Sequence, residues 1–223
     1  MMDDGFVYCR RRTPAGVKIE EVSGGEGCSG AVWRAMAWQV YKENGRDGYR
    51  EVLHTDNGAP VLYDEECRIS ATHTAGLLVV ATLAETPGAD MECFDRHTAL
   101  GVDAERADRL KVLSVRERYL GAAELELVPA DLLPANIMAW TAKEALYKAA
   151  LTPGLDWRRD IRIIRLPVLQ EDLSEHTAVC GEAEVDIPGA GTVAFSLYSY
   201  LSEGCIVTLA LTSDSATHLY PKK

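Results

Sequence analysis

Four strand-like segments that follow one another near the end of the chain place the strongest constraint on the fold. They span residues 161–166, 178–185, 192–200 and 205–211. The last two are apolar or alternate between apolar and polar residues, and Ser202-Glu203-Gly204 between them suits an antiparallel hairpin. A helix is expected just before them, over residues 134–151, because Thr152-Pro153-Gly154 forbids its continuation. Helices followed by neighbouring strands predict an α+β fold.

The first half of the chain has the same coarse layout. Apolar residues repeat with a helical period over residues 31–44, and Asn44-Gly45 is a good stop signal. Residues 77–83 read as a buried strand and residues 98–105 as another, and residues 108–127 are expected to be helical. We therefore expect two similar α+β lobes related by a pseudo-two-fold, formed by residues 1–97 and 98–223.

The charge balance limits the partners of this chain. Its 223 residues include 23 Lys and Arg against 34 Asp and Glu, a net charge of −11, so its mean field repels nucleic acids and anionic membranes. The longest mostly apolar run is about half the length of a membrane-spanning helix, and the N-terminus does not resemble a signal peptide. We expect a cytoplasmic protein with no nucleic-acid or membrane partner. Its six cysteines are scattered and unpaired in sequence, and we expect them to be reduced.

Two short segments could carry chemistry. In Gly101-Val102-Asp103-Ala104-Glu105, the two acidic side chains would share one face of a strand, because side chains alternate with a period of two. Paired carboxylates repel each other, and a bound hard divalent cation commonly offsets this repulsion. The alternative is that both carboxylates simply point into solvent at the end of a strand.

The second segment is Trp140-Thr141-Ala142-Lys143-Glu144-Ala145-Leu146-Tyr147-Lys148. As a helix it places Trp140, Glu144 and Lys148 in one stripe, since they are four residues apart. Glu144 and Lys148 could form an ordinary exposed ion pair. Taken with Asp103 and Glu105, they could instead form an all-oxygen site for one Mg²⁺ with a lysine beside it. We expect Trp140 to pack between helix and sheet.

Together, the two segments resemble the paired signature of the 4′-phosphopantetheinyl transferases, roughly G-[VI]-D-x-E followed by W-[ST]-x-K-E-[AS]-x-x-K. Residues 69–74 resemble the strand of that family that carries S-H-S, and the chain length and final strands fit as well. The resemblance covers about residues 30–212. It favours the larger, pseudo-dimeric branch, which resembles the activators of surfactin synthetase.

This resemblance implies that the protein transfers the phosphopantetheine arm of coenzyme A to a serine of an acyl or peptidyl carrier protein. Mg²⁺ would be the cofactor, held by Asp103, Glu105 and Glu144, and the catalytic residues would be Glu144 and Lys148. Residues implied to bind coenzyme A are His73, Thr72, Lys143 and Lys148. His73 could instead be an ordinary histidine at a strand end, and Lys143 could lie in water.

Two positions depart from the family pattern. Ala59 stands where relatives have a lysine, and the stretch near Glu26 lacks an expected arginine; both positions normally contact the adenosine phosphates. A non-catalytic relative that binds coenzyme A or a carrier protein is therefore an alternative, as is another Mg²⁺-nucleotide enzyme such as a pyrophosphatase. Since two fused lobes make an obligate dimer unnecessary, we expect a monomer. Carrier docking is expected to be mainly apolar, through residues such as Leu113, Leu120 or Leu125.

Overall fold

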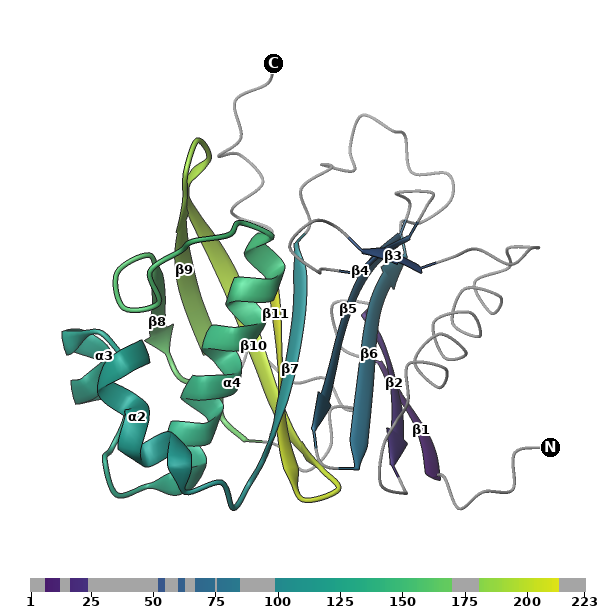
Figure 1. The fold of residues 1–223 in the computed structure, drawn as a ribbon, viewed down its shortest axis with the longest axis horizontal. Coiled ribbons are helices and arrows are strands. Elements are labelled where there is room, and N and C mark those ends of the chain that lie inside the picture. The colour runs from purple at the N-terminus through teal and green to yellow at the C-terminus, as the bar shows by residue number, and fades with distance from the viewer. Residues whose placement is uncertain are drawn as a thin grey trace.

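The computed structural model describes residues 7–12, 17–23, 52–54, 60–62, 67–74, 76–84, 99–169 and 181–212. These ranges contain two large antiparallel sheets, one small two-stranded sheet and a group of helices (Figure 1). None of the helices in these ranges has the length and apolar character needed to cross a bilayer.

The first sheet is built from the N-terminal part of the chain. Its strand order is β1-β2-β6-β5, and every neighbouring pair is antiparallel. The strands are β1 (Val7–Arg12), β2 (Lys18–Ser23), β5 (Cys67–Thr74) and β6 (Leu77–Ala84). The small sheet pairs β3 (Val52–His54) with β4 (Pro60–Leu62). The buried strand expected over residues 77–83 is confirmed as β6, whose Leu77 to Ala81 are almost completely enclosed.

The second sheet contains the strand with the paired acids and the four C-terminal strands. Its order is β7-β11-β10-β9-β8, again with antiparallel neighbours. The strands are β7 (Leu100–Arg106), β8 (Ile161–Arg165), β9 (Gly181–Ile187), β10 (Gly191–Ser202) and β11 (Cys205–Thr212). The hairpin between β10 and β11 is confirmed: Glu203 and Gly204 both have positive φ, of 48° and 71°, as a tight two-residue turn of the primed type requires.

The helices of the second half differ from expectation in one respect. Residues 134–151 are confirmed as α4 (Leu133–Ala150), but residues 108–127 form two helices, α2 (Lys111–Tyr119) and α3 (Ala122–Leu127). The chain is extended at Leu120 and Gly121, and the Glu124 carboxylate accepts the Gly121 N–H at 2.7 Å to cap the new helix. A Cβ at Gly121 would lie 2.8 Å from the Arg158 carbonyl oxygen, so glycine permits this close turn.

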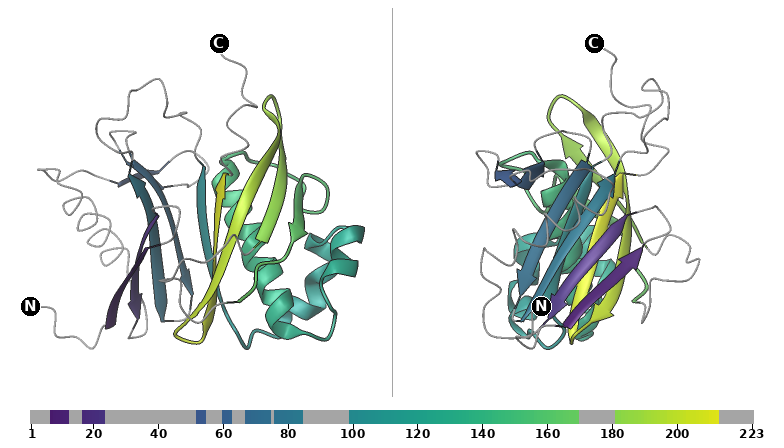
Figure 2. Two further views of the ribbon diagram at one scale, coloured as in Figure 1. Left: turned by 180° about the vertical axis from the view of Figure 1, so that it is seen from behind. Right: turned by 90° about the vertical axis from the view of Figure 1, so that its right-hand side faces the viewer.

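Apolar side chains cover both faces of the second sheet. Helices α2, α3 and α4 pack on one face, as the left view in Figure 2 shows, and their core includes Ala145, Leu146, Ile206 and Phe195. The other face packs against the first sheet through residues such as Ile19, Val79, Val102 and Val207. The order of layers is therefore helices, second sheet, first sheet.

These elements make the protein a mixture of helices and strands, compatible with the α+β expectation. The helix expected over residues 31–44, Ala59 and the stretch near Glu26 lie outside the described residues. The pseudo-two-fold relation and the division into residues 1–97 and 98–223 stay predictions. The strands of the first sheet end at residue 84, and those of the second begin at residue 100.

Candidate active site

Asp103 and Glu105 lie on the face of β7 that is turned toward α4. Leu100, Val102 and Ala104 point into the core between the two sheets, so the intervening positions point the other way. Gly101 brings the helix close, because a Cβ there would overlap the backbone carbonyl oxygen of Ala145. This close approach of helix and strand lets side chains of α4 reach the acidic residues of β7.

Asp103 is almost buried and receives two donors on one oxygen. Lys148 Nζ donates to its Oδ1 at 2.7 Å, and Thr72 Oγ1 of β5 donates to the same atom at 2.9 Å. Lys148 also donates to the Val102 carbonyl oxygen at 3.1 Å. The side chain of Lys148 is 31% exposed and lines the cavity described below, so it can contact a bound anion as well.

Glu105 is held by a different cation. Its Oε2 pairs with the Arg109 guanidinium, and its Oε1 accepts the backbone N–H of Arg106 at 2.9 Å. Thr74 Oγ1 approaches the same Oε1 at 3.4 Å, which is long for a hydroxyl donor. Arg109 was assigned no role in the sequence analysis. The signal that could have found it is its spacing of four residues from Glu105.

Glu144 lies one helical turn before Lys148 on α4 and is half-buried. Burial raises its pKa, and the negative charge of Asp103 raises it further, whereas Lys148 opposes the shift. A carboxyl group with a raised pKa is a better proton acceptor than an ordinary glutamate.

A cavity of about 420 Å³ brings the expected site residues together. Its lining includes the three acidic residues, Lys148, and two residues of β5: Asp103, Glu105, Glu144, Lys148, Thr72 and His73. His73 is exposed at its edge. Residues more than 70 positions apart in the chain therefore share one solvent-accessible space.

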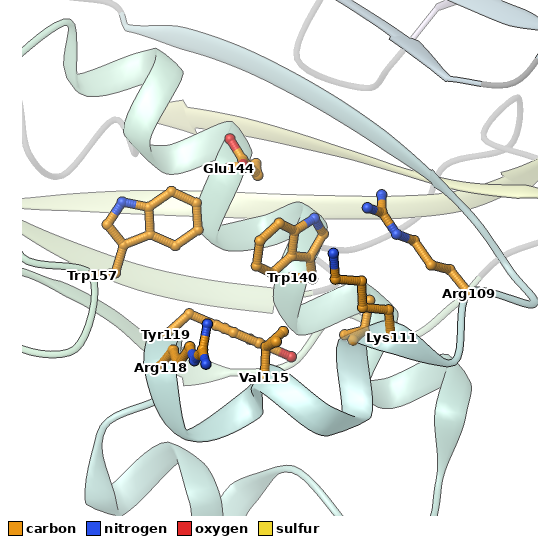
Figure 3. Close-up of a pocket in the computed structure, with 9 residues that line it drawn as sticks. Arg109, Lys111, Val115, Arg118, Tyr119, Trp140, Glu144 and Trp157 are labelled. Atoms are coloured by element: carbon orange, nitrogen blue, oxygen red, sulfur yellow. The ribbon is translucent and has the colours of Figure 1, made fainter.

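A second cavity, of about 380 Å³, shares Arg109, Trp140 and Glu144 with the first (Figure 3). Its wall combines cations with aromatic rings: Arg109, Lys111, Arg118, Tyr119, Trp140 and Trp157. The Trp140 ring meets Tyr119 edge-on at 5.1 Å between centroids and Trp157 at 5.6 Å. We call this second space the aromatic groove.

The aromatic groove bears on two expectations. Trp140 is partly buried against the core that α4 shares with the second sheet, and its ring also meets Tyr119 of α2 and Trp157 and lines both cavities. Leu120 cannot dock a partner, because it is completely buried in the core beneath the helices. The cations of the groove, Arg109, Lys111 and Arg118, can be seen in the sequence. That they line one groove with Trp140 depends on the packing of α2 against α4.

The structure places Lys143 away from both cavities. Its side chain is fully enclosed, and its Nζ donates to the Glu124 carboxylate at 2.7 Å, to the Trp157 carbonyl oxygen at 2.7 Å and to the Ile161 carbonyl oxygen. Burial lowers the pKa of Lys143, and the Glu124 carboxylate opposes this shift. All three donors are used inside the protein, so this arrangement leaves none for the coenzyme A contact that the sequence predicts.

The donor chemistry of the first cavity suits a hard cation, since its three acidic residues offer only oxygen ligands. Within the described ranges, however, no three His, Cys, Asp or Glu side chains are gathered closely enough to hold a metal ion. Asp103 is paired with Lys148 and Glu105 with Arg109. The three acids thus share a cavity, and two of them, Asp103 and Glu105, are each paired with a side-chain cation.

Comparison with known proteins gives one finding that bears on this geometry. Residues 99–186 match the 4′-phosphopantetheinyl transferase superfamily. The matched range runs from the start of β7 into β9 and includes Asp103, Glu105, Glu144 and Lys148, whereas Thr72 and His73 lie before it. A search of curated proteins finds no match to this chain. The superfamily match supports phosphopantetheinyl transfer in general; the larger pseudo-dimeric branch stays a prediction.

Proposed function

We propose that this protein transfers the 4′-phosphopantetheine arm of coenzyme A to a serine of an acyl or peptidyl carrier protein, with Mg²⁺ as cofactor and adenosine 3′,5′-bisphosphate as the leaving group. The observation that carries the proposal is the shared cavity of Asp103, Glu105, Glu144 and Lys148, all of which lie within the range that matches the transferase superfamily.

The proposed reaction needs a site that tolerates a diphosphate. Asp103, Glu105 and Glu144 would hold Mg²⁺, and this would require the three carboxylates to move closer together and the pairs with Lys148 and Arg109 to loosen. When bound, the ion supplies charge neutralisation of the phosphate oxygens. Lys148 would stabilise the charge that develops on the phosphate under attack, since its partly exposed side chain lines the cavity. His73, exposed at the edge, would contact an outer phosphate of coenzyme A.

Glu144 is the best candidate to accept the proton of the attacking serine. Before a cation binds, burial and the charge of Asp103 raise the pKa of Glu144, so it accepts a proton more readily than an ordinary glutamate does. It also lines both cavities, and a serine that entered through the aromatic groove would meet Glu144 before the other two acids.

The direct test incubates the protein with coenzyme A, Mg²⁺ and an apo carrier protein, and then measures the carrier mass. We expect the carrier to gain one phosphopantetheine arm, and omission of Mg²⁺ to abolish the gain. If coenzyme A binds and no carrier gains mass, the non-catalytic alternative replaces this proposal. Release of inorganic phosphate from pyrophosphate without any arm transfer would favour a pyrophosphatase.

The aromatic groove would receive the carrier protein. Carrier proteins are commonly acidic, and the groove places Arg109, Lys111 and Arg118 beside aromatic rings in a chain whose net charge is −11. We therefore expect the carrier to dock through both ionic and apolar contacts, whereas the sequence predicts mainly apolar ones.

Reversing one groove charge tests this docking. Arg118→Glu is expected to raise the KM for the carrier about tenfold, equivalent to about 1.4 kcal/mol, and to leave the KM for coenzyme A unchanged. Arg165→Glu is the matched control, because Arg165 is an exposed arginine of β8 that does not line the groove. Equal carrier KM values for the two variants would place docking elsewhere. Steady-state kinetics with the carrier as varied substrate gives the answer.

A further inference from the structure

Thr72 contacts an acid of the candidate site from a different sheet. It lies on β5 in the first sheet, whereas Asp103 lies on β7 in the second, 31 residues later. Thr72 is buried, with 7% of the residue exposed, and its hydroxyl donates to Asp103 Oδ1 at 2.9 Å, so the group expected to bind a phosphate of coenzyme A is already engaged.

Hydroxyl groups join β5 to β7 along this boundary. In the described part of the chain no backbone ladder pairs the two strands. Instead, the Ser70 hydroxyl accepts the Val102 N–H at 3.0 Å, and two residues further along β5 Thr72 reaches Asp103. Side chains two residues apart point to the same side of a strand, so both hydroxyls face β7. The first sheet thereby fixes the backbone and the carboxylate of β7 at neighbouring positions.

The two donors to Asp103 come from different elements and use the same oxygen. Thr72 approaches from β5 and Lys148 from α4, and both bond to Oδ1. Among the described residues, no hydrogen bond reaches Oδ2. A carboxylate held in this way has one oxygen fixed by the protein and one oxygen free for a ligand.

We propose that Thr72 is a positioning residue that orients the Asp103 carboxylate so that Oδ2 is presented to the divalent cation. This inference rests on the proposed function, since it concerns the same cation site. Groups that hydrogen-bond to a metal ligand fix its orientation, and their loss commonly lowers metal affinity 10- to 100-fold. Thr72 would therefore act through Asp103 and not through contact with substrate.

The experiment measures binding of Mn²⁺ to the full chain by electron paramagnetic resonance, without coenzyme A or carrier. Thr72→Val removes the hydroxyl and keeps the side-chain shape, and we expect Mn²⁺ to bind at least ~10-fold more weakly. Thr72→Ser restores the donor and is expected to bind Mn²⁺ within about threefold of the unaltered protein. Thr72→Ala gives the same loss as Thr72→Val and serves if the valine variant does not fold.

Thr82→Val is the matched control. Thr82 is a buried threonine of β6 in the same sheet, paired with Ile69 of β5, and its hydroxyl has no hydrogen-bond partner among the described residues. We expect Thr82→Val to bind Mn²⁺ as the unaltered protein does. It shows what the loss of a buried hydroxyl does to the first sheet without any contact to Asp103.

The outcomes distinguish the positioning role of Thr72 from the proposed transferase function. If Thr72→Val binds Mn²⁺ as tightly as the unaltered protein, Thr72 does not position Asp103, and the proposed transferase function is untouched. Failure of Thr72→Ser to restore binding also overturns the inference, because it shows that the methyl group and not the hydroxyl matters. If the unaltered protein itself binds no Mn²⁺, the cation site fails, and both the inference and the Mg²⁺-dependent function fail with it.

Discussion

Asp103→Asn is expected to lower kcat/KM for arm transfer about 100- to 1000-fold while the protein stays folded. The substitution keeps the shape of the side chain and removes the negative charge at the oxygen that binds Lys148 and Thr72. A bound cation would lose one of its three acidic ligands. The transition state would then lose about 3–4 kcal/mol of electrostatic stabilisation, which corresponds to the expected fall in kcat/KM. Carrier mass, followed over time, gives the rate.

Asp108→Asn is the control for this prediction. It makes the same change of charge five residues later, at an exposed carboxylate that pairs with Arg106 at 2.7 Å and lines neither cavity. We expect its kcat/KM to stay within about twofold of the unaltered protein, because an exposed ion pair contributes little. If Asp103→Asn and Asp108→Asn transferred the arm at similar rates, the assignment of the cavity as the catalytic centre would be wrong.

Lys143→Met is expected to lower the free energy of unfolding by about 3–5 kcal/mol. Methionine fills a similar volume, but Glu124 then loses its cation while it remains buried between α3, α4 and β8. Glu124 also accepts the N–H groups of Gly121 and Ile163, both at 2.7 Å, so it cannot turn outward without breaking two further hydrogen bonds. Urea unfolding followed by circular dichroism measures the change.

A second variant identifies the cause of that loss. Lys143→Met with Glu124→Gln removes the unpaired charge and keeps a side-chain oxygen as acceptor, and we expect it to recover at least ~1 kcal/mol. The sequence predicts a different role for Lys143, as a contact of coenzyme A. An unchanged free energy of unfolding together with a raised KM for coenzyme A would support that role and contradict the structural one.

The local elements and the set of site residues could largely be predicted from the sequence. Period-two alternation places Asp103 and Glu105 on one face of β7, and helical spacing places Glu144 and Lys148 on one side of α4. Both patterns depend on neighbours in the chain, so they can be read without knowing the fold. The structure then brings these four residues to one cavity.

Contacts between distant segments could not be predicted in this way. Helix geometry turns Lys143 away from Glu144, but only the fold shows that Glu124 and two carbonyl oxygens meet it. The break between α2 and α3 depends on the approach of Arg158 to Gly121, which lies 37 residues earlier in the chain. The bond from Thr72 to Asp103 likewise depends on how two separate sheets meet.

Helix α4 has almost no surface of its own. Eleven of its eighteen residues are buried, and Pro134 alone is exposed. Its alanines fit against Gly101, its Lys143 anchors α3, and its Glu144 and Lys148 line the cavity. A fluorophore, an affinity handle or a solubilising charge therefore has no harmless place along this helix, and exposed residues of other elements, such as Glu126 of α3, suit such changes better.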